Sequence, residues 1–481
     1  MLQAFINVFR IAELRTKILF TLGMLAVFRI GHWIPLPGVN QAELEKFFQQ
    51  QVADGSAAGR AAQFVGVFSG GAFGHSTIFG LGVMPYISAS IIFQLLGSVL
   101  PSMKALQNEG PTGRQKIMEW TRLATIGLCV VQGIGWLKYI SAMGLVYQQW
   151  AANPVWWVMA VAALTAGCMF LMWLGEQIDK HGIGNGVSLI IAAGILTQMP
   201  SAIMWVYANS PLPVIMFDSF NGGVLGFLSP ASRPTATVSF FGVALILAGF
   251  VVVVAGSVLM TVAQRRIPIQ QAKHTRGRKV FGGQRSFLPL RINHGGVMPV
   301  IFASSLMIFP SVIFSMLSQQ AQAAAPDSWW HRTTVWFADS FMNGNFPYVI
   351  CEIILIYFFS YFWITVQFNP EEMSKQLRDH GSFIPGLRPG PRTAEYLETV
   401  MERITYVGAA FLAIIAVTPM IVNKSMNIPF SVTQFLGGTG LLIVVSVVLD
   451  FIQRVEANLL MRNYAGFLSG DAGEGGRRTA A

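Results

Sequence analysis

The sequence predicts an all-α membrane protein that crosses the bilayer many times. Of its 481 residues, 53% are hydrophobic and 11% are charged, whereas about 25% of the residues in an ordinary soluble domain are charged. Several apolar runs reach about 20 residues, the length at which an α-helix crosses a hydrocarbon core of about 30 Å. The two-residue period of lipid-facing β-strands does not occur in the sequence, which excludes a β-barrel.

Ten segments are apolar and long enough to be membrane spans. The fifth and sixth are separated by residues 207–237, which we expect to be an extracytoplasmic hinge loop between a first five-helix half, 18–206, and a second, 238–459. Because five is odd, the halves run in opposite senses. Related halves would form an inverted repeat around a central pore, as in many transport proteins. The expected spans lie near residues 18–37, 79–100, 121–142, 155–174, 185–206, 238–262, 297–317, 347–367, 404–422 and 436–457.

Lysine and arginine residues predict the orientation of these spans. With both termini in the cytoplasm, 25 of the 32 lie on the cytoplasmic side and 5 lie outside. Since cytoplasmic loops carry an excess of positive charge, we expect both termini to be cytoplasmic. Residues 1–17 place apolar side chains on one helical face near Arg10, Arg15 and Lys17, which predicts an amphipathic cytoplasmic helix at the membrane surface. Residues 460–481 form the expected cytoplasmic tail.

The segment before the second span, residues 68–79, is rich in glycine and small polar residues. It is too short and too broken to cross the membrane by itself. We therefore expect a re-entrant segment that turns into a helix near Gly80, Gly82 and Pro85. Irregular backbone at membrane depth is tolerated only where protein buries it or water reaches it, so the segment predicts a cavity.

Few ionisable residues lie within the expected spans. Arg29 either snorkels outward or faces the interior, and Lys138 lies near the outer end of its span, where we expect it to snorkel. Glu352 lies one turn into the eighth span, near the outer surface. None of the three forms a plausible relay with another. The sequence also contains no Walker lysine loop, nucleophile elbow or metal-ligand helix, so we expect no catalytic residue, cofactor or metal.

Isolated isoleucines beside small residues recur in several of the expected spans. A ring of such side chains narrows an aqueous passage until it dewets, which stops ions without a charged filter. Ordinary helix packing is the alternative for each residue taken alone. The isoleucines are Ile87, Ile91, Ile191, Ile301 and Ile443.

Two expected cytoplasmic loops carry distinctive charge. Loop 263–296 continues from a helix into an extended segment and contains eight lysines or arginines and no acid. This pattern favours docking to a polyanionic or acidic partner, such as RNA or an acidic protein surface, with anionic lipid headgroups as the alternative. Loop 368–403 has mixed charges and holds Arg388 between two Pro/Gly turns, which predicts a stiff protein-docking tip.

Eight long motifs follow one another over roughly residues 5–465. They are FSGGAFGHSTIFGLGVMPYISASIIFQLL, NEGPTGRQKI, GEQIDKHGIGNGVSLII, QRRIPIQQAK, GGVMPVIFASSLMIFP, FNPEEMSKQL, GSFIPGLRPG and GGTGLLIVV. In these motifs the chain resembles the SecY family, the channel subunits of bacterial protein translocases.

The resemblance implies a passive channel that moves unfolded secretory polypeptides across the bacterial inner membrane and releases transmembrane segments laterally into it. Such a channel is not an enzyme, and its energy comes from a partner ATPase, the ribosome or the proton motive force. The partners that the resemblance implies are small membrane subunits resembling SecE and SecG, the motor ATPase SecA, the ribosome through its RNA, signal sequences, nascent polypeptides and membrane lipids.

The resemblance also implies roles for individual residues. The five isoleucines match a pore ring, and the helix segments 82–100 and 297–309 match the two sides of a lateral gate. The implied plug residues are Gly70, Gly71, Phe73, Gly74, His75, Ser76 and Thr77. The implied gate residues are Ser88, Ser90, Gln94, Val297, Ser304 and Ser305. The implied residues for docking the motor or the ribosome are Arg265, Arg266, Lys273, Arg276, Arg278, Lys279 and Arg388.

Two other functions compete with a protein-conducting channel. A secondary transporter for a small solute uses the same inverted-repeat logic, but it needs a mid-membrane relay and has no use for the basic loop. A membrane assembly scaffold explains the basic loop but not the glycine-broken second span.

Overall fold

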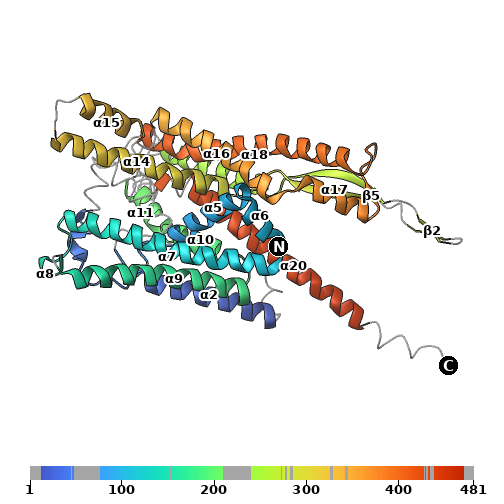
Figure 1. Cartoon of the computed structure of the whole chain (residues 1–481), viewed down its shortest axis with the longest axis horizontal. Helices are drawn as coiled ribbons and strands as arrows, with labels where there is room; N and C mark the ends of the chain where they lie inside the picture. The colour runs from blue at the N-terminus through green and yellow to red at the C-terminus, as the bar shows by residue number, and fades with distance from the viewer. Residues whose placement is uncertain are drawn as a thin grey trace, which may run out of the picture. The chain divides into compact units, whose positions relative to one another are not determined.

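The computed structural model of the chain describes residues 12–44, 46–47, 76–151, 153–209, 240–271, 274–276, 279–281, 285–324, 329–341, 345–426, 428, 432–433 and 438–470 (Figure 1). The chain divides into two compact units. The first consists of Met1–Gln50, Phe64–Gln198 and Val447–Ala481, and the second of Gln51–Gln63 and Met199–Ser446.

The described part of the first unit consists of helices joined by turns and loops. Its core contains Trp156, which is fully buried among helix side chains such as Leu137, Ile140 and Leu164. The indole Nε1 of Trp156 donates a hydrogen bond to the carbonyl oxygen of Pro37 at 2.8 Å. The helices are α2 (Ala12–Gly31), α5 (Met84–Val99), α6 (Pro101–Asn108), α7 (Pro111–Ala142), α8 (Gln148–Ala151), α9 (Pro154–His181) and α10 (Gly186–Leu196), with the larger part of α20 (Thr439–Gly470).

The second unit combines helices with five short strands. Figure 1 shows α15 beside the end of α14, and aromatic contacts join them, with the ring centroids of Phe314 and Phe337 5.1 Å apart. The helices are α11 (Met199–Asn209), α13 (Phe240–Val262), α14 (Met298–Ala324), α15 (Trp329–Ser340), α16 (Phe346–Gln367), α17 (Pro370–Asp379) and α18 (Pro391–Met426). The strands are β1 (Gln264–Gln271), β2 (His274–Arg276), β3 (Lys279–Phe281), β4 (Arg285–Arg291) and β5 (Ser382–Phe383).

Local signals explain where several helices begin. Proline occupies the first turn of α7, α9, α16 and α17, where its missing N–H costs no hydrogen bond. The side-chain oxygens of Asn153 and Asn185 cap α9 and α10, and each accepts a backbone N–H at 3.0 Å. These caps satisfy donors that a helix start otherwise leaves unpaired inside a membrane protein.

Each of the ten predicted spans falls on a helix of the described chain, the fifth on α10 and α11 with a short turn between them. Six of the described helical segments are long and apolar enough to cross a membrane, and Met84–Gly97 and Met298–Met307 are shorter apolar helices. The helix α2 contains residues 18–31 of the first predicted span, and α20 contains residues 439–457 of the last.

The structure differs from the predicted boundaries at the first two spans. Residues 12–17 are not a separate helix, because α2 is continuous from Ala12 to Gly31. No proline interrupts it, and Glu13 and Lys17 form an i,i+4 ion pair at 3.7 Å. The second span was predicted to begin at residue 79, but residues 76–83 form turns and α5 begins at Met84. Gly82 there has a φ of 58°, a conformation that ends regular helix and suits glycine.

A small sheet joins the two predicted docking loops. Strand β1 pairs antiparallel with β4 on one side, with Arg266 opposite Pro289, and with β5 on the other, with Gln270 opposite Phe383. The extended segment predicted after the sixth span is therefore a strand. Its inward side chains, among them Ile267, pack with Leu290, Ile384 and Leu397 in one apolar cluster.

Candidate pore, gate and docking surface

Three of the predicted ring isoleucines belong to the first unit. Ile87 and Ile91 lie one turn apart on α5 and share a helix face. Ile87 is buried and Ile91 is half-buried. Ile191 lies on α10 and is buried as well.

The other two ring isoleucines belong to the second unit and are almost fully buried. Ile301 lies in the first turn of α14, and its backbone N–H donates to the carbonyl oxygen of Val297 at 3.2 Å. Ile443 lies near the start of α20. With Ile87, Ile91 and Ile191, these residues all stand in the first eight residues of their helices. The sequence pattern of isoleucines beside small residues did not predict this shared position, because the pattern does not indicate where a helix begins.

Most of the predicted plug lies outside the described residues, namely Gly70, Gly71, Phe73, Gly74 and His75. Its last two residues, Ser76 and Thr77, are buried in the first unit. The carbonyl oxygen of Ser76 accepts the backbone N–H of Leu36 at 3.0 Å, and its hydroxyl accepts the indole N–H of Trp136 at 3.1 Å.

The neighbouring residues continue this attachment. Thr77 forms a β-bridge with Pro35, and the backbone N–H of Ile78 donates to the carbonyl oxygen of Ile34 at 3.1 Å. Ser76 holds a φ of 40°, which a serine adopts only where its surroundings fix it. Residues 76–78 are thus bound to the loop after α2. In the sequence, this attachment point lies between the plug glycines Gly70, Gly71 and Gly74 and the start of α5.

Replacing Trp136 with phenylalanine tests this attachment. The change keeps an aromatic ring but leaves the buried hydroxyl of Ser76 without its donor, so we expect the free energy of unfolding to fall by about 1–2 kcal/mol. Unfolding of the detergent-solubilised chain measures it. Trp173→Phe is the control, because Trp173 is exposed, and equal stability of the two variants would contradict the attachment.

The polar gate residues of α5 are half-buried. Gln94 Nε2 donates a hydrogen bond to Ser90 Oγ, one turn earlier, at 3.3 Å. Gln94 Oε1 is buried and has no hydrogen-bond partner among the residues that the structure describes. Ser88 lies one residue beyond Ile87 on the same helix. The helix α5 therefore carries the ring residue Ile87 together with Gln94, whose side-chain oxygen has no hydrogen-bond partner among the described residues.

The polar gate residues of α14 have a different environment. Ser304 is buried, and its hydroxyl donates to Glu352 Oε1 of α16 at 3.1 Å. Ser304 is therefore bound to a neighbouring helix and is not a free polar group of a gate surface. Ser305 Oγ is buried without a partner among the described residues, and Val297, just before α14, is half-buried.

Glu352 is the functional candidate that the sequence reasoning missed. The sequence places it one turn into the eighth span, near the outer surface, and gives it no role. In the structure it lies in the second turn of α16, and its side chain is 1% exposed. The signal that could have found it is the cost of a carboxyl group in an apolar span, which requires a partner. The other two ionisable residues behave differently, because Arg29 and Lys138 are both exposed on their helices.

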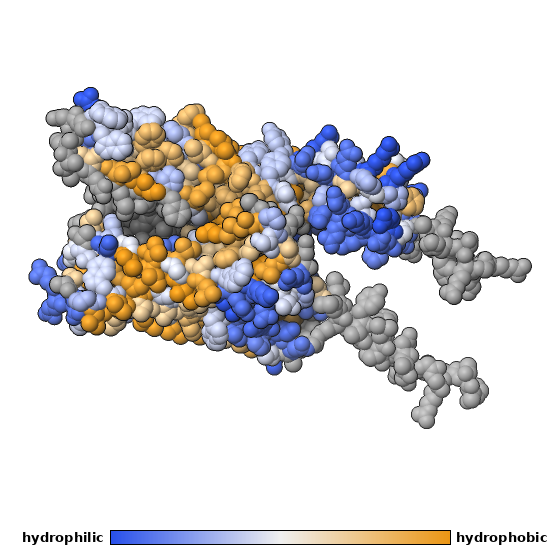
Figure 2. Space-filling view, viewed as in Figure 1, coloured by the Kyte–Doolittle hydropathy of each residue, from blue (hydrophilic) through white to orange (hydrophobic). Residues whose placement is uncertain are grey.

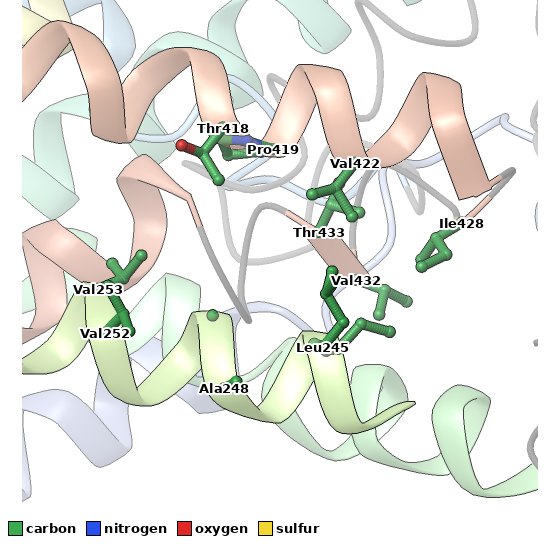
Figure 3. A pocket seen from close by; sticks show the side chains of 12 residues that line it. Leu245, Ala248, Val252, Val253, Thr418, Pro419, Val422, Ile428, Val432 and Thr433 are labelled. Atoms are coloured by element: carbon green, nitrogen blue, oxygen red, sulfur yellow. The ribbon is translucent and has the colours of Figure 1, made fainter. Parts of the chain in front are cut away.

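The second unit also contains an apolar cavity of about 280 Å³ between α13, α18 and the residues Ile428, Val432 and Thr433 (Figure 3). Aliphatic side chains such as Leu245, Val252 and Val422 line most of it. The hydroxyl of Thr418 donates to the carbonyl oxygen of Ile414 at 2.7 Å within α18. Specific binding of a polar solute requires several convergent polar groups, whereas Thr418 and Thr433 are the two polar side chains among the described lining residues.

The predicted docking arginines gather around the sheet. Arg265 and Arg266 are exposed on β1, and Arg388 is exposed in the turn that follows β5. Because β1 pairs with β5, two loops that are far apart in the sequence present their arginines on one sheet-based element. Figure 2 shows hydrophilic residues gathered over α17 and these strands, and hydrophobic residues over the membrane helices of the same unit.

Two of the remaining docking residues, Arg276 and Lys279, lie on the short strands β2 and β3. These strands form a two-stranded sheet in which the two residues pair with one another. Lys273 and Arg278 lie outside the described residues.

The turn that carries Arg388 is held on both sides. Thr393 Oγ1 donates to the carbonyl oxygen of Arg388 at 2.9 Å, and Ser374 Oγ donates to that of Gly390 at 2.8 Å. Gly386 and Gly390 have φ values of 88° and 130°, which only glycine adopts readily. The stiff tip predicted from the Pro/Gly pattern is therefore present.

The long apolar helices are those of a polytopic α-helical membrane protein. The fold agrees with solved structures of membrane channels. "The structure of a protein conducting channel" matches with a TM-score of 0.57 and 19% identity, covering 96% of this chain and 95% of that one. Canine Sec61 in a ribosome–channel complex matches with a TM-score of 0.54 and 18% identity, covering 96% of this chain and 95% of that one. The predicted fold class is confirmed.

Sequence comparison identifies the family. The SecY family model matches residues 77–452. The protein translocase subunit SecY of Chlamydia muridarum is 38% identical over 98% of this chain and 99% of its own length. That of Thermotoga maritima is 37% identical over 97% of this chain and 98% of its own length. The chain belongs to the SecY family. The predicted resemblance is thereby confirmed, and so is the prediction that the chain is not an enzyme, because this is a family of channels.

Proposed function

We propose that the chain is the conducting subunit of a bacterial protein translocase. It moves unfolded secretory polypeptides across the inner membrane and releases transmembrane segments laterally into it. The observation that carries this proposal is the match, over nearly the whole chain, to relatives named protein translocase subunit SecY. Both termini are cytoplasmic in this proposal, as the distribution of lysine and arginine supports.

The isoleucines supply the seal in this proposal. A passage for unfolded polypeptides must accept every type of side chain, so specific polar binding groups would hinder it. Ile87, Ile191, Ile301 and their counterparts form a deformable apolar collar that excludes ions by dewetting. Residues 68–79 act as the plug, and within it residues 76–78 are the part bound to the loop after α2. The helices α5 and α14 form the two sides of the gate.

The sheet of the second unit is the docking element for an outside energy source. Two solved structures that share the fold include a ribosome, namely Sec61 in the canine ribosome–channel complex and the idle yeast Ssh1 complex bound to the 80S ribosome. Arg265 and Arg266, exposed on β1, and the exposed Arg388 in its turn are the contacts for the motor ATPase SecA or for the ribosome, whose RNA phosphates attract arginine. Small subunits resembling SecE and SecG complete the translocase.

Reconstitution tests the function directly. The chain is placed in proteoliposomes with SecE-like and SecG-like subunits, SecA, ATP and a preprotein that carries a signal sequence. We expect preprotein to become protected from added protease, and only when ATP and the signal sequence are both present. A folded complex that protects no preprotein would overturn the proposal and reopen the solute transporter, which the comparisons do not favour.

A cysteine at position 191 tests the pore assignment. In a chain whose native cysteines are replaced, Ile191→Cys should crosslink to a polypeptide stalled in translocation, because a ring residue contacts the passing chain. The matched control is Ile190→Cys. Ile190 is buried in an apolar cluster with Leu174 and Ile178, so we expect no crosslink from it. Absence of a crosslink from all five ring positions would remove the pore assignment.

A further inference from the structure

A buried carboxyl group connects two helices of the second unit. Glu352 lies in the second turn of α16 and is 1% exposed, and Ser304 of α14 is 3% exposed. The hydroxyl of Ser304 donates to Glu352 Oε1 at 3.1 Å. Surrounded by apolar side chains, such a bond is stronger than at a wet surface, and its loss leaves a polar group buried without a partner. The bond therefore holds α14 to α16 at a defined point.

Apolar contacts lie on both sides of this bond along the two helices. The Phe302 ring lies 5.8 Å from Phe359 and 5.5 Å from Trp363, measured between centroids. Met307, about one turn after Ser304, packs with Tyr348, one turn before Glu352. Residue numbers thus rise along α14 as they fall along α16, so the helices pack antiparallel. The hydrogen bond between Ser304 and Glu352 lies between two apolar contacts. Because a hydrogen bond depends on direction and apolar contacts do not, this bond is the part of the interface that requires a specific orientation of α14 against α16.

The polar groups around the bond are not saturated. Glu352 Oε2 and Ser305 Oγ are both buried and have no hydrogen-bond partner among the described residues. The carboxyl group is therefore held to α14 by Ser304. A proline lies within α14 at position 310, where it removes one backbone hydrogen bond and weakens the helix. The part of α14 that carries Ile301 and Ser304 can thus tilt apart from the rest of the helix when the bond is released.

We propose that Glu352 is a positioning residue of the lateral gate. Through Ser304 it holds the first part of α14 against α16, so that α14 resists moving, and it thereby sets how strong a signal sequence must be to open the gate. We call the hydrogen bond between Ser304 and Glu352 the latch. Ser304 is the point on α14 that the latch holds, and it is not a contact for the passing chain. The inference rests on the proposed function, because the assignment of α14 to the gate comes from there.

The test is a double-mutant cycle with a preprotein whose signal sequence is weakened. Ser304→Ala and Glu352→Ala should each raise protected product about tenfold, which corresponds to about 1.4 kcal/mol. The double variant should give no more than either single one, because both remove the same bond. Glu352→Gln should stay within about twofold of the unchanged chain, since its amide oxygen still accepts from Ser304.

Ser360→Ala is the matched control. Ser360 is also buried on α16, but its hydroxyl donates to the carbonyl oxygen of Ile356 at 2.7 Å within the same helix. Its loss should leave the product from the weakened signal sequence unchanged. Additive effects of the two alanine variants, or an equal effect of Ser360→Ala, would overturn the latch. If Glu352→Ala does not fold, Ser304→Ala and Glu352→Gln still decide the question.

Two further measurements separate failure of the latch from failure of the channel. The unchanged chain is assayed with an intact signal sequence, and absence of protected product there rejects the proposed function. Thermal unfolding of the same variants in detergent measures the coupling of Ser304 and Glu352 without any translocation. Ser304 and Glu352 could be coupled in thermal stability while the signal-sequence requirement of the variants stays unchanged. The bond would then stabilise the fold only, which would reject the latch but not the proposed channel.

Discussion

Export driven by the motor ATPase is expected to fall at least about tenfold when Arg388 is replaced by glutamate, as charge reversal at a docking contact costs 1.4 kcal/mol or more. Arg388 is exposed, and it forms no ion pair with any residue in the described part of the chain. Its turn is held by hydrogen bonds from Thr393 and Ser374. The cation is therefore presented in a fixed place without an internal partner, as a docking contact requires.

The measurement is the amount of protease-protected preprotein formed with SecA and ATP. Thermal unfolding should be unchanged, because an exposed side chain without packing contributes little to stability. Lys375→Glu is the matched control, since Lys375 is exposed on α17 outside the turn. Arg388→Lys should retain part of the activity through its charge. Normal export by Arg388→Glu would show that the turn is an ordinary solvated loop.

Polar substitution in the pore ring should have the second large effect. Ile301→Asn or Ile443→Asn is expected to raise ion leak through the resting channel at least about tenfold, because lowering a barrier by about 1.4 kcal/mol changes a rate by that factor. An amide group wets the constriction, and a dewetted constriction is what stops ions. The same variants should accept preproteins with weakened signal sequences.

The control must separate the ring from ordinary packing. Ile356 on α16 is fully buried but is not a ring residue, so Ile356→Asn should destabilise the fold without raising the leak of the folded fraction. Ion flux into proteoliposomes is measured on material that has passed a folding check. Normal permeability and normal signal-sequence stringency in both ring variants would leave Ile301 and Ile443 as packing residues.

The sequence by itself determined the class, the ten helical segments and the family. Span length and hydropathy are local properties of the sequence, so membrane-spanning helices can be predicted without knowledge of the tertiary structure. The turn around Arg388 was predictable because its signal is also local. Gly386 and Gly390 have positive φ values, which glycine adopts readily, and this preference of glycine does not depend on the residues packed around it.

Only the tertiary structure decided which distant residues meet. The pairing of β1 with β5 and the burial of Ser76 against Leu36 and Trp136 join segments that no local period connects. The bond between Ser304 and Glu352 spans 48 positions of the sequence. A buried polar group must find a partner, but hydropathy does not say which one, since that choice depends on how α14 packs against α16.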